Sequence, residues 1–473
     1  MKGTRLALAA SLPFLGAAAG KECSGTATIS SQSDADSISD CNTFDGDVTF
    51  APDASGDISL GDLRVIKGDL SASGSDSGLT GISAAKLTDI NGDLTISSLR
   101  GLASINFPSL RLVGGPVSVS DLPFLTSLNV PEINSIGSLS LTTAPLLTDL
   151  NFGTFPATDD LSVGLRHITG SSATVTIKSI GASDITPIFG SWNASKVEVA
   201  DMRNLDSMIL LVGNVDDFRI SGNGNLSLHM GQKGWSGDVQ PVINRLSISG
   251  VVHVAPCLYP DVHEFVVEDN TVEYLHFGLM ALRKLEVRRN PNLRYLVPFN
   301  GDSRFDWNLT DVVIEENPVL RLVETPKRAE NDTRTSENCP YMWGDENEPF
   351  VWFSEELHNV IVSGNVDNSF FTSLIGPWLD GAGGHVYEGP NHGPARITEK
   401  LSISSTDESF DCTDFNTLRS GWGAIPGEYS CQGKTIPAGG GSSAGGDKDG
   451  GVGGRVVSWT WGLAAVLVGV LSW

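Results

Sequence analysis

Three aspartates recur at equivalent places in the first part of the chain. If the repeats stack, their carboxylates come close together in space, and a glycoside hydrolase uses neighbouring carboxylates for catalysis. Asp47, Asp69 and Asp93 each follow a glycine and precede a short apolar segment, at intervals of 22 and 24 residues. Glycosidases place two carboxylates about 5–9 Å apart, as acid and as base or nucleophile. A solvated turn is nevertheless the favoured interpretation, because Pro116 takes the place of the aspartate in the next repeat.

No other group of residues predicts catalysis. His385 and His392 lie in "GGHVYEGPNHG", where the absence of H-E-x-x-H and of a carboxylate motif indicates loop residues rather than metal ligands. The sequence has no nucleophile elbow, phosphate loop or zinc-ligand set. A calcium-binding ladder would need a denser glycine pattern. We therefore predict no catalytic residue, no metal site and no cofactor.

The two ends of the chain predict secretion and a lipid anchor. Residues 1–20 combine a charged start, an apolar stretch and small residues before a cleavage site, which is typical of a secretory signal peptide. Residues 435–455 form a Gly/Ser-rich linker, and residues 456–473 form an apolar tail. This order predicts attachment of a glycosylphosphatidylinositol (GPI) anchor at Ser443, with Ser442 and Gly446 as alternatives, and removal of the tail.

In a secreted chain the six cysteines predict disulfides. Cys23 and Cys41 lie close together at the start of the mature chain, and Cys412 and Cys431 lie close together near its end. Each pair would form a disulfide that closes a loop of fewer than twenty residues at one end of the mature chain. By the chain-entropy estimate, such a disulfide stabilises the folded protein by roughly 3 kcal/mol. Cys257 and Cys339 are assigned to each other only by elimination.

Charge and glycosylation motifs indicate an extracellular surface. The formal net charge of −25 argues against nucleic acid and anionic membrane surfaces as partners. Four N-x-S/T sequons predict glycosylation, at Asn193, Asn225, Asn308 and Asn331. No Trp or Tyr precedes Trp192. We take this change as a boundary near residue 190 between two domains, 21–190 and 191–434.

The aspartates belong to a repeat of 22–24 residues, whose strands begin at Val48, Leu70, Leu94, Val117 and Leu139. Apolar and polar residues alternate within each unit, so that Leu94 and Ile96 should face a core while Thr95 faces outward. A strand this short cannot bury one face alone. Stacked about 4.8 Å apart as successive turns of a coil, however, such strands form a parallel sheet over a continuous core. The glycine before each strand suits a corner that needs positive φ or close backbone approach.

Two further patterns support a coil. A second apolar register, Phe107, Val130 and Phe152, keeps the same period. In the second half, strand-like segments end in an asparagine that would cap a turn through the backbone, at Asn223, Asn270, Asn290, Asn317 and Asn365. We predict an all-β, right-handed parallel β-coil. A leucine-rich horseshoe with outer helices is the weaker alternative, because no 3.6-residue periodicity separates the strands.

One segment interrupts the coil pattern. Residues 338–353, "NCPYMWGDENEPFVWF", include the aromatics Tyr341, Trp343, Trp352 and Phe353. Aromatic rings stack on sugars, so a glycan-binding loop is one interpretation. Large aromatics are normally buried, where truncation costs several kcal/mol. We predict that these rings pack in the core.

Two stretches resemble one protein family. The segments "KECSGTATISSQSDADSISDCNTFDGDVTF" and "LTDINGDLTISSLRGLASINFPSL" resemble the fungal GPI-anchored cell-wall organisation proteins, which include sporulation-specific wall proteins. The segment "FDCTDFNTLRSGWGAIPGEYSCQGK" is similar to the closing cysteine segment of that family. The resemblance covers residues 22–152 and 410–434. It implies two tandem coils similar to receptor L domains, a role in wall integrity, and no catalytic residues.

Two hypotheses follow. The first is a non-catalytic, GPI-anchored protein on the outer leaflet of the plasma membrane and in the fungal cell wall, which binds wall glycans or wall proteins on a flat, Ser/Thr-rich surface. The second is a β-coil polysaccharide hydrolase or transglycosylase acting on wall glycan. A facing pair of carboxylates in a groove would favour the enzyme.

Overall fold

The structure is a computed structural model, and backbone contacts divide the chain into the units Met1–Thr435 and Ile436–Trp473. It describes residues 21–153, 165, 167–169, 172–185, 188–189, 192–210, 213–230, 242–256, 261–277, 279, 281–298, 308–323, 350, 352, 354, 356–379 and 395–433. Everything below concerns these residues, all of which lie in the first unit. Ser443, the linker and the apolar tail lie outside them.

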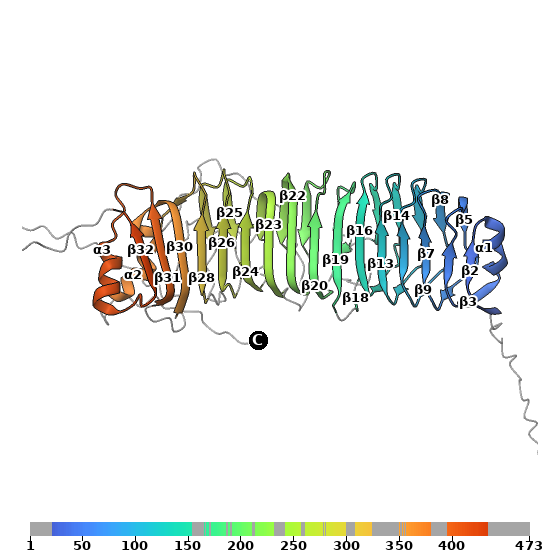
Figure 1. Ribbon diagram of the computed structural model, residues 1–473, viewed down its shortest axis with the longest axis horizontal. Coiled ribbons are helices and arrows are strands. Elements are labelled where there is room, and N and C mark those ends of the chain that lie inside the picture. The colour runs from blue at the N-terminus through green and yellow to red at the C-terminus, as the bar shows by residue number, and fades with distance from the viewer. Residues whose placement is uncertain are drawn as a thin grey trace, which may run out of the picture. The chain divides into compact units, whose positions relative to one another are not determined.

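The first unit is a parallel β-coil. One strand from each successive turn joins the main sheet, and the strands lie side by side in chain order (Figure 1). They are β2 (Ala27–Ile29), β4 (Val48–Phe50), β7 (Leu70–Ser73), β10 (Leu94–Ser97), β13 (Pro116–Ser120), β16 (Ser138–Ala144), β19 (Thr174–Ile180), β20 (Ala194–Ala200), β22 (Asn214–Met230), β23 (Val242–Pro256), β24 (Asp261–Glu268), β26 (Lys284–Arg288), β28 (Asp311–Glu315), β30 (Glu356–Val366), β31 (Arg396–Ser405) and β32 (Glu428–Gln432).

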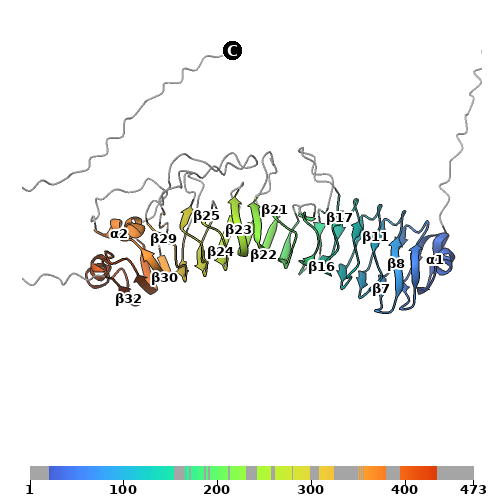
Figure 2. The same ribbon diagram turned by 90° about the horizontal axis from the view of Figure 1, so that it is seen from above.

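Two further sheets complete each turn in the first part of the coil. The side sheet follows the main sheet along the chain and consists of β5 (Ser55–Ser59), β8 (Gly78–Ser83), β11 (Ser104–Asn106), β14 (Ser127–Asn129) and β17 (Asp149–Asn151). The third sheet consists of β1 (Lys21–Ser24), β3 (Cys41–Asp45), β6 (Val65–Ile66), β9 (Asp89–Ile90), β12 (Leu112–Val113), β15 (Ser135–Ile136) and β18 (His167–Ile168). Figure 2 shows β11 and β17 on the side of the coil opposite β7 and β16.

In the second part of the coil, long strands turn the corner from one side to the next. β21 (Ser207–Leu210) pairs with the later half of β22, and β29 (Arg321–Leu322) pairs with the end of β30. β25 (Tyr274–Phe277) and β27 (Tyr295–Pro298) pair with each other. The parallel-coil prediction is thus confirmed. The right-handed sense and the likeness to receptor L domains stay predictions.

The predicted strand register is confirmed. Val48, Leu70, Leu94, Val117 and Leu139 are Cα partners on neighbouring strands. Leu94 and Ile96 are buried, at 3% and 1% exposure, whereas Thr95 between them is half-buried on the outer face. The alternation of apolar and polar residues therefore places one face of every turn in the core.

The main sheet continues through the predicted domain boundary near residue 190. β19 pairs with β20, and β20 pairs with β22, all in parallel. One cluster of buried apolar side chains also extends from Ala27 to Ile425. The division into 21–190 and 191–434 stays a prediction, and the strands on its two sides share one sheet.

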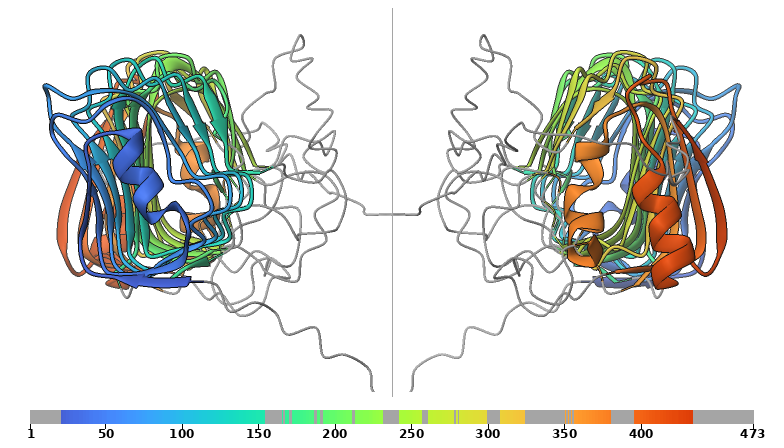
Figure 3. Two further views of the ribbon diagram at one scale, coloured as in Figure 1. Left: turned by 90° about the vertical axis from the view of Figure 1, so that its right-hand side faces the viewer. Right: turned by 90° about the vertical axis from the view of Figure 1, so that its left-hand side faces the viewer.

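Both ends of the coil carry a disulfide and a helix. Cys23 bonds to Cys41 and Cys412 bonds to Cys431, so both predicted end disulfides are present. Figure 3 shows α1 (Gln32–Ser39) crossing the amino-terminal end of the coil, where Ala35 and Ile38 are buried. The other end carries the helices η2 (Asn368–Phe371), α2 (Thr372–Leu379), α3 (Thr413–Thr417) and η3 (Leu418–Trp422). Cys257 and Cys339 lie outside the described residues.

Helix α1 contacts β2, the first strand of the main sheet, and thereby shields this edge from pairing with another chain. Within the described part of the chain, none of the helices has the length and apolar composition needed to cross a membrane.

A buried ladder of asparagines supports the second part of the coil. Asn270 and Asn290 are fully buried and Asn317 is 3% exposed. The backbone N–H of Asn270 donates to Oδ1 of Asn290 at 3.0 Å, and the backbone N–H of Asn290 donates to Oδ1 of Asn317 at 3.0 Å. Asn223 is exposed but also caps a turn: its Nδ2 donates to the Arg203 carbonyl at 3.0 Å, and its Oδ1 accepts the backbone N–H of Asn225 at 2.8 Å. The predicted backbone capping is thus confirmed for Asn223 and for the three buried asparagines, while Asn365 is exposed.

An aromatic cluster fills the carboxy-terminal end of the core. Trp352 is 4% exposed, its ring lies 5.4 Å from that of Phe370 and 5.5 Å from that of Phe371, and its Nε1–H donates to the Phe370 carbonyl at 2.8 Å. Phe350, which sequence reasoning did not single out, packs 5.2 Å from Trp352. The core prediction is confirmed for Trp352. The side chains of Tyr341, Trp343 and Phe353 lie outside the described residues.

Trp352→Ala is expected to lower the free energy of unfolding by about 3–5 kcal/mol, because it removes a buried indole and leaves a cavity among phenyl rings. Urea unfolding followed by circular dichroism measures this change. The matched control is Trp422→Ala, whose side chain is 51% exposed and which we expect to cost less than about 1 kcal/mol. Equal unfolding curves for the wild type and Trp352→Ala would contradict the packing described here.

Candidate functional site

The three repeated aspartates form a column at the corner before the main sheet, and their carboxylates hold consecutive turns together. Oδ1 of Asp47 accepts the backbone N–H of Asp69 at 2.9 Å, and Oδ1 of Asp69 accepts the backbone N–H of Asp93 at 2.8 Å. Pro116 has no N–H to offer Asp93, so this pattern of bonds ends there. The side chains lie on the outer corner, as predicted, and each of the first two carboxylates has a structural partner.

Close approach of the neighbouring turn requires the glycines before these strands, and Gly46 alone among Gly46, Gly68, Gly92, Gly115 and Gly137 also has a positive φ, of 146°. A Cβ on Gly92 would lie 2.8 Å from the carbonyl oxygen of Gly68, and a Cβ on Gly137 would lie 2.8 Å from that of Gly115. Positive φ also occurs just after the strands, at Gly74 with 146° and at non-glycine residues such as Ser98 at 56° and Asp121 at 53°. The stacked corners before β7, β10, β13 and β16 therefore need the smallest residue, at Gly68, Gly92, Gly115 and Gly137.

The outer face of the main sheet carries two columns of hydroxyl groups, which we call the hydroxyl columns. Paired positions place hydroxyl side chains next to one another at Thr49, Ser71, Thr95, Ser118, Ser140 and Thr176, and again at Ser73, Ser97, Ser120 and Thr142. Thr49 and Ser71 also share a hydrogen bond of 3.0 Å. The Ser/Thr-rich flat face expected from the sequence is thus present in the first part of the coil.

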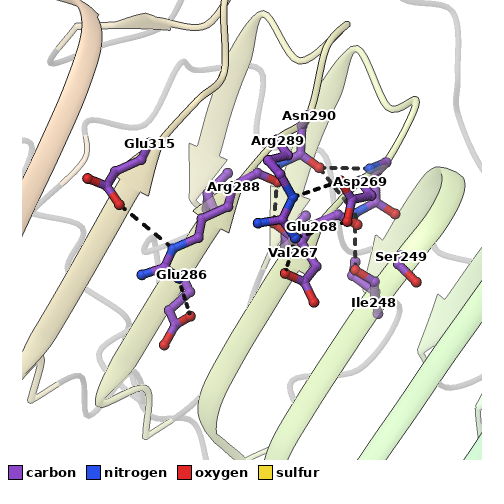
Figure 4. Close-up of polar contacts among 12 residues, drawn as sticks. Ile248, Ser249, Val267, Glu268, Asp269, Glu286, Arg288, Arg289, Asn290 and Glu315 are labelled. Atoms are coloured by element: carbon purple, nitrogen blue, oxygen red, sulfur yellow. Dashed lines mark hydrogen bonds and ion pairs between the residues drawn. The ribbon is translucent and has the colours of Figure 1, made fainter.

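The face changes character in the second part, where charged residues replace hydroxyl groups (Figure 4). Arg289 binds Glu268 at 2.7 Å and Asp269 at 3.0 Å, and these bonds, led by that to Asp269, raise the pKa of the guanidinium. Lys196 binds Glu198 at 2.9 Å and lowers the pKa of that carboxyl. Exposed pairs of this kind contribute little to stability. Acidic and basic groups largely satisfy one another here.

A ladder of amides runs along the outer face of the side sheet. Nδ2 of Asn129 donates to Oδ1 of Asn106 at 2.7 Å, and Nδ2 of Asn151 donates to Oδ1 of Asn129 at 2.7 Å. In the neighbouring column, Oγ of Ser127 donates to Oδ2 of Asp149 at 2.8 Å. Sequence reasoning missed this ladder. The 23- and 22-residue intervals between its asparagines, each followed directly by an apolar residue of the second register, were the available signal.

None of the described side chains forms a group of three or more metal-ligating residues. His385 and His392 lie outside the described residues. The cavity inside the first part of the coil is lined only by apolar side chains, including Leu94, Ile105 and Phe152. It belongs to the core and offers no polar group to a ligand.

Two curated relatives are similar to this chain. Protein ecm33 of Aspergillus fumigatus is 28% identical over 218 residues, which are 45% of this chain and 47% of that protein. A cell surface GPI-anchored protein of Arthroderma benhamiae is 34% identical over 95 residues, which are 20% of this chain and 24% of that protein. The chain is a relative of fungal GPI-anchored cell-wall proteins. It spans less than half the length of each of the two relatives.

Two other comparisons gave no match: no family model matches the chain, and no solved structure is significantly similar to it. The relationship to fungal GPI-anchored surface proteins locates the chain at the cell surface. The sequon residues Asn193, Asn225 and Asn308 are exposed, which leaves them accessible to glycosylation. Asn331 and the anchor residue Ser443 lie outside the described residues.

Proposed function

We propose that the protein is a non-catalytic component of the fungal cell surface, which contributes to wall organisation by binding wall glycans or wall proteins. The observation that carries this proposal is the set of outward polar columns, in which hydroxyl and amide groups repeat once per strand of a parallel sheet. Such groups are about 4.8 Å apart and are fixed by the backbone. A rigid, evenly spaced row of donors and acceptors suits a polymer that is itself repetitive.

The position of the carboxylates supports a non-catalytic role over a hydrolase or transglycosylase. Asp47 and Asp69 bind backbone N–H groups of the next turn, and all three aspartates line one corner in a single column. A glycosidase needs two carboxylates that face each other across the scissile bond. The names of the two relatives refer to no enzymatic activity.

Three further features belong to this proposal. We infer attachment of the GPI anchor at Ser443 after removal of 456–473, secretion directed by 1–20, and glycosylation at the four sequons. The tandem L-like division at residue 190 and the Cys257–Cys339 disulfide are also proposed. Together they describe a glycoprotein held on the outer leaflet of the plasma membrane.

Deletion of the gene is expected to make the fungus more sensitive to agents that stress the cell wall and to alter its surface morphology. The measurement is growth on wall-perturbing dyes, and the control is the deletion strain carrying the full-length gene. Unchanged growth and morphology in the deletion strain would contradict a role in wall organisation.

A further inference from the structure

The amide ladder of the side sheet has unused bonding capacity. A primary amide has two N–H donors and an oxygen that accepts two hydrogen bonds. Within the ladder, Asn129 uses one N–H toward Asn106 and accepts one bond from Asn151. A donor and a lone pair on this amide therefore remain for a ligand. Because the ladder bonds and the paired strands β11, β14 and β17 fix its position, binding would cost little side-chain entropy.

Two exposed apolar side chains lie where the strands of the side sheet begin, five residues before the ladder asparagines at the strand ends. Phe124 is 58% exposed and Leu146 is 47% exposed, although both belong to a coil with a well-filled core. They occupy equivalent positions of consecutive turns, each three residues before a strand of the side sheet, and the backbone N–H of Thr148 bonds to the carbonyl of Thr126 just beyond them. Single exposed apolar residues are common, but two at equivalent positions of consecutive turns, at the start of strands that carry polar rows, give this side of the coil a mixed surface.

A surface that offers both amide groups and exposed apolar side chains is suited to binding a carbohydrate. A β-linked hexose ring has a ring of hydroxyl groups at its rim and an apolar face of C–H groups, and the latter packs on aromatic and aliphatic side chains. The strand spacing of about 4.8 Å is comparable to the length of one sugar residue in an extended polysaccharide. A chain that runs along the coil would thus present one sugar to each turn.

The charge of the protein and the side chains of this surface favour a neutral, unsubstituted polysaccharide. The net charge of −25 and the carboxylate of Asp149 within the surface disfavour an anionic polymer. The polar rows consist of the short side chains of Asn, Ser and Asp, which suit the hydroxyl groups of an unsubstituted sugar. An unsubstituted sugar fits this surface best.

We propose that the outer face of β11, β14 and β17, with Phe124 and Leu146 at its border, binds a neutral, linear, β-linked glucose polymer lying along the coil. This inference rests on the proposed function and assigns its binding site. Asn106, Asn129 and Asn151 bond the hydroxyl groups, and Phe124 and Leu146 contact the apolar faces of the sugar rings.

The test measures cosedimentation of the full-length protein, purified from a fungal host, with particles of linear β-1,3-glucan and, in parallel, of chitin. Phe124→Ala and Asn129→Ala are each expected to weaken glucan binding at least about tenfold, which corresponds to about 1.4 kcal/mol. Because Phe124 is exposed, Phe124→Ala should leave the melting temperature unchanged. This variant therefore tests the binding site even if Asn129→Ala destabilises the coil.

The matched controls are Asn91→Ala, an exposed asparagine at another corner, and Val319→Ala, a 50% exposed residue at the corresponding corner of a later turn. Both should bind glucan as the wild type does. Wild-type binding by Phe124→Ala would overturn the inference and leave the proposed function intact. Binding to chitin but not to glucan would overturn the assigned ligand. If the wild type bound no wall polysaccharide and no wall protein, the proposed function itself would fail.

Discussion

Ile96→Asp is expected to destabilise the coil by at least about 5 kcal/mol and to abolish secretion. Ile96 is 1% exposed, and its Cα partners on the neighbouring strands are Ala72 and Val119. The substitution removes buried methylenes, at about 2–5 kcal/mol, and places a carboxyl among apolar side chains without a partner, at about 2–7 kcal/mol. The cavity beside Ile96 is lined by apolar residues only, so no polar group is near enough to compensate.

Thr95→Asp is the matched control, because Thr95 precedes Ile96 on the same strand and its side chain lies on the outer face. A carboxylate there remains hydrated, and the change should cost less than about 1 kcal/mol. The readouts are the amount of secreted protein and its thermal unfolding curve. Equal loss of secretion by the two variants would show that the inward and outward faces are wrongly assigned.

Asn290→Ala is expected to cost about 3–6 kcal/mol, because it interrupts the buried ladder at its centre. Nδ2 of Asn290 donates to the Val267 carbonyl at 3.1 Å, and Oδ1 accepts the backbone N–H of Asn270 at 3.0 Å. Alanine leaves these buried groups without their partners, and each such loss costs about 1–3 kcal/mol. Chemical denaturation of the purified protein measures the difference.

Asn365→Ala provides the comparison, since Asn365 also ends a repeat unit in the sequence but is exposed. We expect it to change the free energy of unfolding by less than about 0.5 kcal/mol. If the two variants were equally stable, the asparagine ladder would not support the coil.

Sequence reasoning predicted the strands of the first part of the coil because two signals agreed there. The apolar–polar alternation set the inward face, and the nearly regular spacing of Leu70, Leu94 and Val117 set the register, which the structure reproduces. Repetition is a strong signal because a shift by one residue would turn every apolar side chain outward.

The corners were less predictable. Glycine permits both positive φ and close approach, so the sequence alone left both explanations open at Gly92. Asp121 takes the left-handed conformation instead, at a cost of roughly 1–2 kcal/mol that the surrounding turns offset. The amide ladder was missed for a different reason. Apolar side chains must be buried, whereas polar residues such as Asn129 are compatible with any outward position, so only their shared period distinguishes them.

In the second part of the coil, insertions make the repeat irregular and therefore hard to recognise in the sequence. The intervals between Asn223, Asn270, Asn290 and Asn317 vary, and only the structure separates buried ladder members from exposed ones. For the same reason Trp352 was assigned to the core by the general preference of indole rings for burial, while its partners Phe370 and Phe371 were not foreseen.

The most direct test of the account combines binding and hydrolysis in one experiment. The purified full-length protein is incubated with isolated wall β-glucan, and both the bound fraction and the reducing ends released over time are measured. We expect saturable binding with no release of reducing ends above the protein-free control. Reducing ends that increase with time and with protein concentration would contradict a non-catalytic wall protein.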